Sequence, residues 1–554
     1  MNFELPPTGT EQSPAFVNAA ACEEWLGKVP MANAVQAQSM FLHQLQLLHR
    51  YTLSPTERFA ILETLRKSVC TVQEDAGKKF AGKPLPFAPH EQAALESTLN
   101  VWHALGIGYL RCFDALCCGD TGVFSTPVLV AQHAQIVSHP ELAGRAAKLA
   151  QRTLSVFADW QVDLCRGGQL PDAAYWKTLH QIFSAAETLG VTARAVTDSV
   201  RHGAAQSSAL AVYAECNLVS TANVYELPAR HQAWVVRWAK RWGPKIALLK
   251  APPEDIRTRA VPLWIDVESD RPAAYIPQLS SGSRWLETTE LRKSLIARIT
   301  LLAQGREPAE LQLGEDVTQP AATQLLQRIL QRWCKGGVPR RHERHAANAG
   351  CSFIAGLEAV HFYLSGRQVF RAPTRSDTAL RREREEFETF GDRSHKTEGA
   401  ADKDDSHVES WCLVDGSAGG LRISRPLKEG VRIGAGLIIA VKITDSQQFT
   451  LGNVRWALHE GDNSLAAGIQ LFPGEARPVA IRIMDSGETG SPWRQGFLLP
   501  EIVALNESAS VVVPAGTFRL DRSIEVMVDQ KPQVLKLFRV LDRGGEFERC
   551  KFYD

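Results

Sequence analysis

The stretch CKGGVP, residues 334–339, marks the position where the hydrophobic pattern of this chain changes. Two consecutive glycines and a proline interrupt regular structure, because glycine leaves the backbone free and proline cannot continue a helix. Before this stretch apolar residues recur every three or four positions, and after it they occur in short β-branched runs. The sequence therefore predicts an α-helical region over residues 1–335, a hinge or boundary, and β domains after it.

The helical region contains clear start and stop signals. Ser54 precedes a proline and is followed three residues later by Glu57, which is a capping box. Asp172 caps another segment, and Gly190 follows that segment as a left-handed stop. Further helices are expected at 91–118, 142–165, 208–219, 230–241, 288–303 and 321–334. Many helices joined by short connections predict a bundle or a solenoid, and the run 261–267 has the composition of a short strand.

The remainder of the chain is predicted to form two β domains. Short runs rich in β-branched and aromatic residues occur at 354–364, 411–414, 437–443, 449–456, 468–471 and 479–483. Separated by glycine, asparagine, aspartate and proline, they predict a small barrel over residues 336–486. The strand pattern resumes after residue 487, so residues 487–554 are predicted to form a small C-terminal β unit, with a degenerate second barrel as one possible form. The fold class is therefore α+β and multidomain.

A charged insertion interrupts the first β domain at about residues 371–407. The motifs RREREEFE and DKDD within it carry both charge signs and almost no core-forming residues, which is typical of a solvated excursion. A charged loop is the simpler interpretation, and a regulatory or partner-binding role is the alternative.

Composition excludes several classes of protein. The 554 residues include 62 lysines and arginines against 61 acidic residues, so no general attraction to nucleic acid or to an anionic membrane is expected. The sequence contains no run of about 18 apolar residues, so no membrane insertion is predicted. The N-terminal sequence lacks a secretory leader, which favours the cytoplasm. The 11 cysteines are scattered without a C-x-x-C pair, so they are predicted to be reduced core thiols.

Two polar clusters on either side of the insertion are the candidate site. The first contains Arg340, Arg341 and Arg344, and the second is DGSAGG, residues 415–420. Guanidinium groups can bind phosphate or the O6 and N7 atoms of guanine, and a carboxylate can accept hydrogen bonds from the N1 and exocyclic amine of guanine. Together they predict a guanine nucleotide site. Each cluster alone would be weak, because a basic pentamer is usually solvated surface and D-G-S is usually a turn.

These clusters resemble the two motifs of the PilZ-domain family of cyclic di-GMP receptors. The R-x-x-x-R motif is matched by Arg340 and Arg344, and the [DN]-x-S-x-x-G motif by Asp415, Ser417 and Gly420. The runs 453–456 and 468–471 are similar to late strands of the same barrel. The resemblance covers about 336–485, and about seventy residues separate the motifs, more than is usual in the family; the insertion accounts for the difference.

The resemblance implies a role for each matched residue. Arg340 and Arg344, with Arg341 beside the first, would bind guanine and phosphate of cyclic di-GMP. Asp415 and Ser417 would contact guanine from the barrel wall, and Gly420 would hold the turn.

No catalytic or metal-binding constellation is predicted. His342 and His345 are three residues apart, one short of a zinc-protease helix motif, and the D-G-S-A-G run lacks the first glycine of a nucleophile elbow. The prediction is a cytoplasmic bacterial receptor, not an enzyme, with cyclic di-GMP as ligand, no other cofactor, and an unidentified protein partner of its helical region. A non-binding scaffold in a motility or secretion assembly is the alternative.

Overall fold

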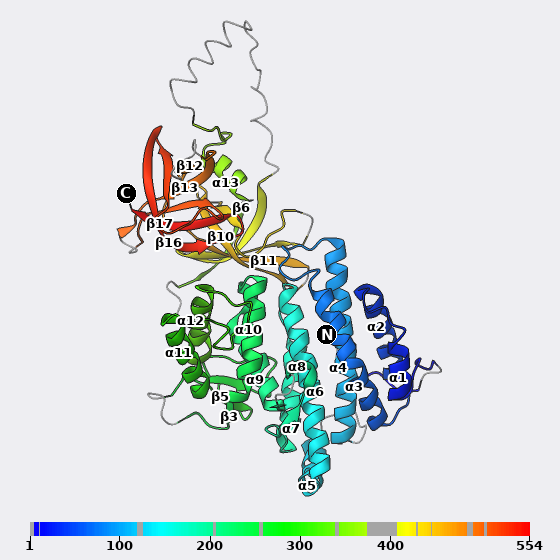
Figure 1. Cartoon of the computed structure of the whole chain (residues 1–554). Coiled ribbons are helices and arrows are strands. Elements are labelled where there is room, and N and C mark those ends of the chain that lie inside the picture. The colour runs from blue at the N-terminus through cyan, green and yellow to red at the C-terminus, as the bar shows by residue number, and fades with distance from the viewer. Residues whose placement is uncertain are drawn as a thin grey trace. The chain divides into compact units, whose positions relative to one another are not determined.

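The computed structural model, drawn in Figure 1, divides the chain into two compact units. It describes residues 5–9, 12–118, 126–202, 206–253, 259–337, 343–373, 407–427, 430–444, 446–461, 463–484, 491–503 and 507–553. The first unit comprises Met1–Lys83 and Phe87–Pro339, and the second comprises Pro84–Pro86 and Arg340–Asp554. The predicted fold class is confirmed: helices form the N-terminal part, and two closed barrels follow.

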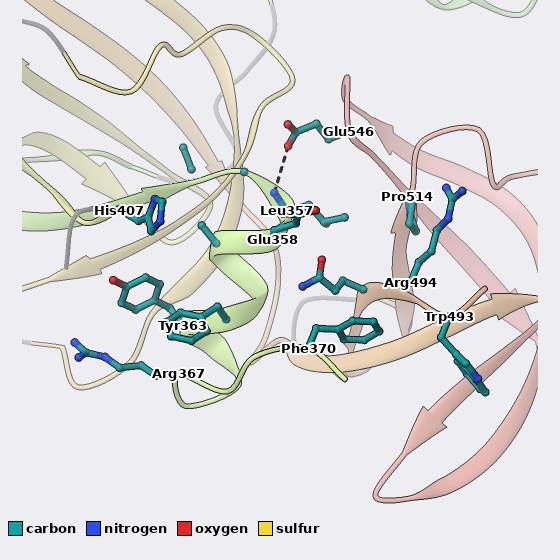
Figure 2. Close-up of a pocket in the computed structure, with 15 residues that line it drawn as sticks. Leu357, Glu358, Tyr363, Arg367, Phe370, His407, Trp493, Arg494, Pro514 and Glu546 are labelled. Atoms are coloured by element: carbon teal, nitrogen blue, oxygen red, sulfur yellow. Dashed lines mark hydrogen bonds between the residues drawn. The ribbon is translucent and has the colours of Figure 1, made fainter. Parts of the chain in front are cut away.

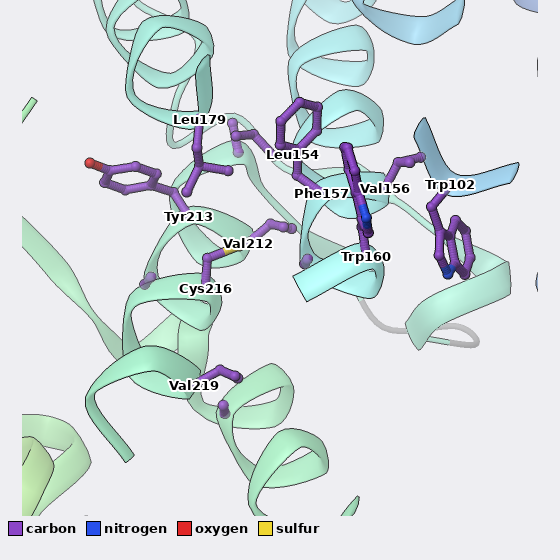
Figure 3. Close-up of a cluster of buried hydrophobic side chains, with 14 of the residues drawn as sticks. Trp102, Leu154, Val156, Phe157, Trp160, Leu179, Val212, Tyr213, Cys216 and Val219 are labelled. Atoms are coloured by element: carbon purple, nitrogen blue, oxygen red, sulfur yellow. The ribbon is translucent and has the colours of Figure 1, made fainter. Parts of the chain in front are cut away.

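The first unit is built mainly from helices that pack on one another. The helices are α1 (Ala19–Leu26), α2 (Ala34–Arg50), α3 (Pro55–Gly77), α4 (Pro89–Cys118), α5 (Thr126–Ser138), α6 (Pro140–Arg166), α7 (Ala173–Thr188), α8 (Ser199–His202), α9 (Ala209–Ala222), α10 (Ala229–Trp242), α11 (Thr289–Ala303) and α12 (Ala321–Cys334). Helix α4 packs on α2, α3, α5 and α6, and α6 packs in turn on α7 and α9. Figure 3 shows their apolar faces meeting around Trp160, Phe157 and Tyr213, which are completely buried.

The helix signals in the sequence are confirmed by hydrogen bonds. Ser54 accepts from the N–H of Glu57 at 3.2 Å and donates to its carboxylate at 2.8 Å. Asp172 accepts from the N–H of Tyr175 at 2.8 Å, and Gly190 has the left-handed φ of 70°. These side chains satisfy backbone groups that a helix end leaves without a partner.

Short strands complete the first unit. Strands β1 (Val196–Thr197) and β2 (Gln206–Ser207) pair with each other, and β3 (Ala247–Leu249), β5 (Ser283–Glu287) and β4 (Leu263–Asp266) form a three-stranded sheet in that order. Strand β4 confirms the strand predicted within 261–267. The described part of this unit also includes the single-turn 3-10 helices Val224–Glu226 and Gly243–Lys245.

Charged side chains are buried between α3, α6 and α8, and each acid faces an arginine. Both guanidinium N–H groups of Arg66 donate to Asp198 at 2.8 Å, and Arg152 lies 3.3 Å from Asp198 and 3.0 Å from Glu63. A second cluster of the same kind contains Arg201, Asp159 and Glu215. Because every acid is neutralised by a neighbour, the clusters are suited to hold the helices in place.

The linker glycines, Gly336 and Gly337, come just after α12, and Gly337 is hydrogen-bonded to it. Gly336 and Gly337 have left-handed φ values of 78° and 88°. The N–H of Gly337 donates to the carbonyl of Gln331, and the Gln331 amide donates to the carbonyl of Gly337, both at 3.1 Å. The ring of Tyr275 lies 2.7 Å from the position of a Cβ on Gly337, which leaves room only for glycine. Residues 338–342 lie outside the described part.

The first barrel closes in the strand order β10-β11-β8-β7-β6-β9. Its strands are β6 (His345–Ala355), β7 (Glu409–Ser417), β8 (Gly420–Pro426), β9 (Ile438–Ile443), β10 (Thr450–Glu460) and β11 (Ser464–Leu471). All neighbours pair antiparallel. The charged insertion lies outside the described residues, apart from its margins.

The strand predicted at 354–364 is wrong beyond residue 355. Strand β6 ends at Ala355, Gly356 takes a φ of 93°, and Leu357–Leu364 forms helix α13. A short, continuously apolar run carries no clear period, so it fits a strand and a buried helix equally well. The helix buries Val360 completely and His361 almost completely.

The second barrel closes in the order β12-β13-β14-β17-β16-β15. Its strands are β12 (Arg477–Ile483), β13 (Arg494–Leu499), β14 (Ser510–Pro514), β15 (Ser523–Val528), β16 (Lys531–Arg543) and β17 (Phe547–Tyr553). Strand β12 belongs to this barrel, so the predicted end of the first barrel at residue 486 is too late in the chain. Helix α13 packs on strands of both barrels, and one apolar cluster containing Val360, Leu451 and Phe547 joins them.

Candidate functional site

The second motif forms the tight hairpin between β7 and β8. Ser417 pairs with Gly420 across a two-residue turn, and its hydroxyl donates to the carbonyl of Gly420 at 3.3 Å. The N–H of Leu471, in β11, donates to the carbonyl of Gly419 at 3.2 Å. The turn is therefore held from within and by the neighbouring strand.

Gly420 is required by the close approach of β11. A Cβ built on it would lie 2.6 Å from the backbone oxygen of Ile469, closer than real Cβ atoms come to an oxygen. The clash is with backbone, which cannot rotate away. This explains in physical terms the glycine that the motif contains.

The structure brings the two motifs into contact. Arg344 lies immediately before β6, and its Nη1 donates to Oδ1 of Asp415 at 2.8 Å across 71 residues of sequence. The register explains the contact, because Ala346 pairs with Asp415. The side chains of Arg344 and Asp415 are 33% and 23% exposed, so the pair is open to a ligand.

Further polar and aromatic groups lie in the same cross-strand row as Asp415. Asp415 pairs with Arg422, Arg422 with Gly468, and Gly468 with Trp456. The indole of Trp456 lies directly over Gly468, where any Cβ would overlap it. Leu421 and Ile423, the neighbours of Arg422 in β8, are buried, so this row lies on the outer face of the barrel. Arg422 is paired with Glu460.

Trp456 is predicted from the sequence only as a strand residue, and Arg422 is not among the predicted site residues. The signal that could have found them is the strand alternation: Arg422 follows Gly420 by two residues, so both point to one face. Trp456 could not be placed without the β10–β11 register, which contains a bulge between Val454 and Trp456.

The structure describes only part of the arginine motif. Arg344, Asp415, Ser417 and Gly420 are described and lie together, as the geometry above shows. Arg340 and Arg341 lie outside the described residues.

A hollow lies elsewhere in the second unit, between α13 and the second barrel. It has a volume of about 990 Å³, and Figure 2 shows Tyr363, Arg367 and Phe370 on one side and Arg494 on the other. The N–H of Leu357 donates to the carboxylate of Glu546 at 3.3 Å at its edge. None of the motif residues that the structure describes lines this hollow, so its size does not make it the ligand site.

The described part of the chain contains no metal-ligand cluster, no disulfide and no helix suited to span a membrane. No group of three or more histidine, cysteine or acidic side chains there could hold a metal ion. The nine cysteines whose side chains are described are free, and seven of them are buried, as predicted for core thiols. Among the described residues no helix combines the length and the apolar character needed to cross a membrane.

A six-stranded barrel with an R-x-x-x-R segment before its first strand and a D-x-S-x-x-G hairpin defines a PilZ-type receptor domain, here between a helical unit and a second barrel. The models of one family match three consecutive stretches of the chain: the N-terminal domain of the cyclic-di-GMP receptor FimW at residues 20–254, its middle PilZ domain at 263–411, which begins at β4 of the helical unit, and the FimW C-terminal β-barrel domain at 479–554. The chain belongs to this PilZ-domain family of cyclic-di-GMP receptors.

A curated relative supports the same assignment over the whole length. The cyclic-di-GMP receptor FimW of Pseudomonas aeruginosa is 21% identical over 593 aligned positions, which cover 99% of this chain and 92% of the relative. The PilZ match ends at residue 411, inside β7, so it includes the arginine motif and stops before Asp415. The second motif therefore rests on the structure and the sequence pattern.

Proposed function

We propose that this chain binds cyclic di-GMP on the outer face of its first barrel and transmits binding to its helical unit. The binding residues are Arg340, Arg341, Arg344, Asp415, Ser417 and Gly420. The observation that carries the proposal is the 2.8 Å contact between Arg344 and Asp415, which joins the two motifs despite their separation in sequence.

The chemistry of the site fits a guanine dinucleotide. An ionised carboxylate accepts up to about four hydrogen bonds, so Asp415 can keep Arg344 and still accept from N1–H and the exocyclic amine of guanine. The arginine forks can donate to O6, N7 and phosphate oxygens, which suits a ligand with two phosphate charges. Trp456, in the same row, offers a flat indole face on which a base can stack.

Two further parts of the proposal concern context. We place the receptor in the cytoplasm, because free thiols are typical of a reducing compartment. It acts by changing partner contacts of its helical unit and not as an enzyme. The acids Asp198 and Glu63 in that unit are paired with arginines, so neither carboxylate is free to act as a catalytic base.

Calorimetric titration of the full chain with cyclic di-GMP tests the site. Arg340→Ala and Arg344→Ala should each weaken binding by tens to a hundredfold, or about 2–3 kcal/mol, because charge-assisted hydrogen bonds are lost. Arg519→Ala, at an exposed arginine of the second barrel, removes the same charge far from the motif in sequence and should leave the affinity unchanged. Wild-type affinity in both motif variants would refute the site, and no binding by the wild type would favour the scaffold.

A further inference from the structure

A short segment of the α3–α4 connection belongs to the barrel unit. Leu85 and Ile433 form an isolated antiparallel bridge in which each N–H donates to the other's carbonyl at 2.7 Å. The Leu85 residue is 3% exposed and Ile433 is completely buried. The bridge thus has the short bonds and burial of a regular strand pair, although it is only one residue long.

Additional contacts hold the same segment. Nε and Nη2 of Arg432 donate to the carbonyl of Pro84 at 3.2 and 3.0 Å. A Cβ on Gly434 would lie 3.6 Å from Cα and Cβ of Pro84, in ordinary van der Waals contact. We call these contacts of Pro84–Pro86 with residues 432–434 the clamp.

The clamp is connected through the barrel to the strands of the second motif. Arg425, near the end of β8, is 3% exposed and donates to the carbonyl of Val431 at 3.1 Å. Glu409, at the start of β7, accepts from the N–H of Val431 at 2.6 Å and lies 3.4 Å from Nε of Arg425. Both strands of the motif hairpin therefore hold the residue that precedes Arg432.

On its other side the clamp continues directly into two long helices. Helix α3 ends at Gly77 and α4 begins at Pro89, so only a short connection contains Leu85. Phe80 and Phe87 hold the two ends of that connection close together, because their rings pack edge to face at a centroid distance of 6.5 Å. Because the connection is short, we expect a displacement of Leu85 to move the end of α3 and the start of α4 as well.

We propose that the clamp is the contact through which ligand binding at the β7–β8 hairpin reaches α3 and α4. The inference rests on the proposed function, since it needs cyclic di-GMP to bind there. Coupling of this kind requires an element that both sites bias, and the network from Glu409 and Arg425 to Leu85 supplies a contiguous one.

Hydrogen exchange of the full chain with and without saturating cyclic di-GMP tests the clamp. The wild type should show a ligand-dependent change in exchange at the end of α3 and the start of α4. Arg432→Ala removes the bonds to Pro84, and Leu85→Asp places a charge in a buried position without altering the barrel sequence. Both variants should still bind ligand, exchange the Leu85 and Ile433 amides faster, and lose the response of the helices, whereas Arg519→Ala should keep it.

A disulfide provides the rescue. Cβ atoms near 3.6 Å apart at positions 84 and 434 fit the geometry of a disulfide, so Pro84→Cys with Gly434→Cys should restore the clamp in the Arg432→Ala background. The helix response should return on oxidation, verified by peptide mass, and disappear on reduction.

The outcomes separate the two proposals. Absence of ligand binding by the wild type would refute the proposed function. Ligand binding with accelerated exchange at Leu85 but an unchanged response of α3 and α4 would overturn the clamp. If Arg432→Ala does not accelerate exchange of the Leu85 and Ile433 amides, the Leu85→Asp variant is tested instead, and an unchanged response of α3 and α4 in that variant would overturn the clamp.

Discussion

Gly420→Ala is the substitution whose effect the structure defines most closely. The new methyl carbon would lie 2.6 Å from the backbone oxygen of Ile469, so β8 and β11 would have to separate by several tenths of an ångström. Gly416→Ala is the matched control in the same hairpin. Its methyl would lie 3.1 Å from Cδ2 of Leu421, the far end of a flexible side chain that can turn away.

The expected loss of stability depends on whether the group that the new methyl meets can move. Overpacking against a fixed neighbour typically costs about 1–3 kcal/mol, and the free energy of unfolding of the barrel unit should fall by that amount in Gly420→Ala. For a unit of this size each kcal/mol lowers the melting temperature by about 2–4 °C. Gly416→Ala should cost less than about 1 kcal/mol, because its obstacle can move.

Ligand affinity should follow the same order. Separation of β8 from β11 displaces the turn that positions Ser417 and Asp415, so Gly420→Ala should weaken cyclic di-GMP binding at least about tenfold, or 1.4 kcal/mol. Differential scanning calorimetry and calorimetric titration measure the two quantities on the same samples. Equal effects of the two alanines, or wild-type stability and affinity in Gly420→Ala, would refute the packing argument.

Three further results are expected. Burial raises the pKa of Asp198, but the hydrogen bonds and charge of Arg66 outweigh this effect and hold the pKa well below its usual range. The resulting stabilisation is present above about pH 4 and is lost as the pH falls. Asp198→Asn should therefore lower the free energy of unfolding of the helical unit by about 3–5 kcal/mol, measured by urea unfolding at pH 7. Gly337→Ala, at a φ of 88° beneath the Tyr275 ring, should lower the melting temperature of that unit without changing ligand affinity. Replacing residues 375–405 by a short Gly/Ser link should change stability by about 1 kcal/mol or less, because loop entropy varies logarithmically with length, and loss of binding in the folded variant would show that the insertion contributes to the site.

The sequence predicted those parts of the fold that depend on interactions between residues close together in the chain. Ser54 and Asp172 start helices because a side-chain oxygen satisfies free N–H groups within the first turn, which needs no tertiary information. The change of period after residue 335 likewise separates helices from barrels. The run 354–364 failed because its switch from strand to helix occurs at Gly356, within an uninterrupted apolar sequence.

Contacts between distant parts of the sequence were beyond such signals. The motif residues could be selected because two chemically matched clusters occur on either side of the insertion, but the Arg344–Asp415 bond needs the β6–β7 register. Strand β12 could not be assigned to a barrel from its own composition, since partner choice decides it. The bridge between Leu85 and Ile433 has no motif, because backbone groups alone make it.

Titration of the wild-type chain with cyclic di-GMP and, in parallel, with cyclic di-AMP tests the central claim most directly. Both ligands carry the same two phosphates, but only guanine has an N1–H donor next to its exocyclic amine. N1 of adenine is an acceptor and cannot donate to the carboxylate of Asp415. The account predicts saturable heat with cyclic di-GMP and binding at least about a hundredfold weaker with cyclic di-AMP, as expected when a site built to hydrogen-bond one base meets a base that lacks the matching donors. Equal affinity for the two dinucleotides, or no heat with cyclic di-GMP, would contradict it.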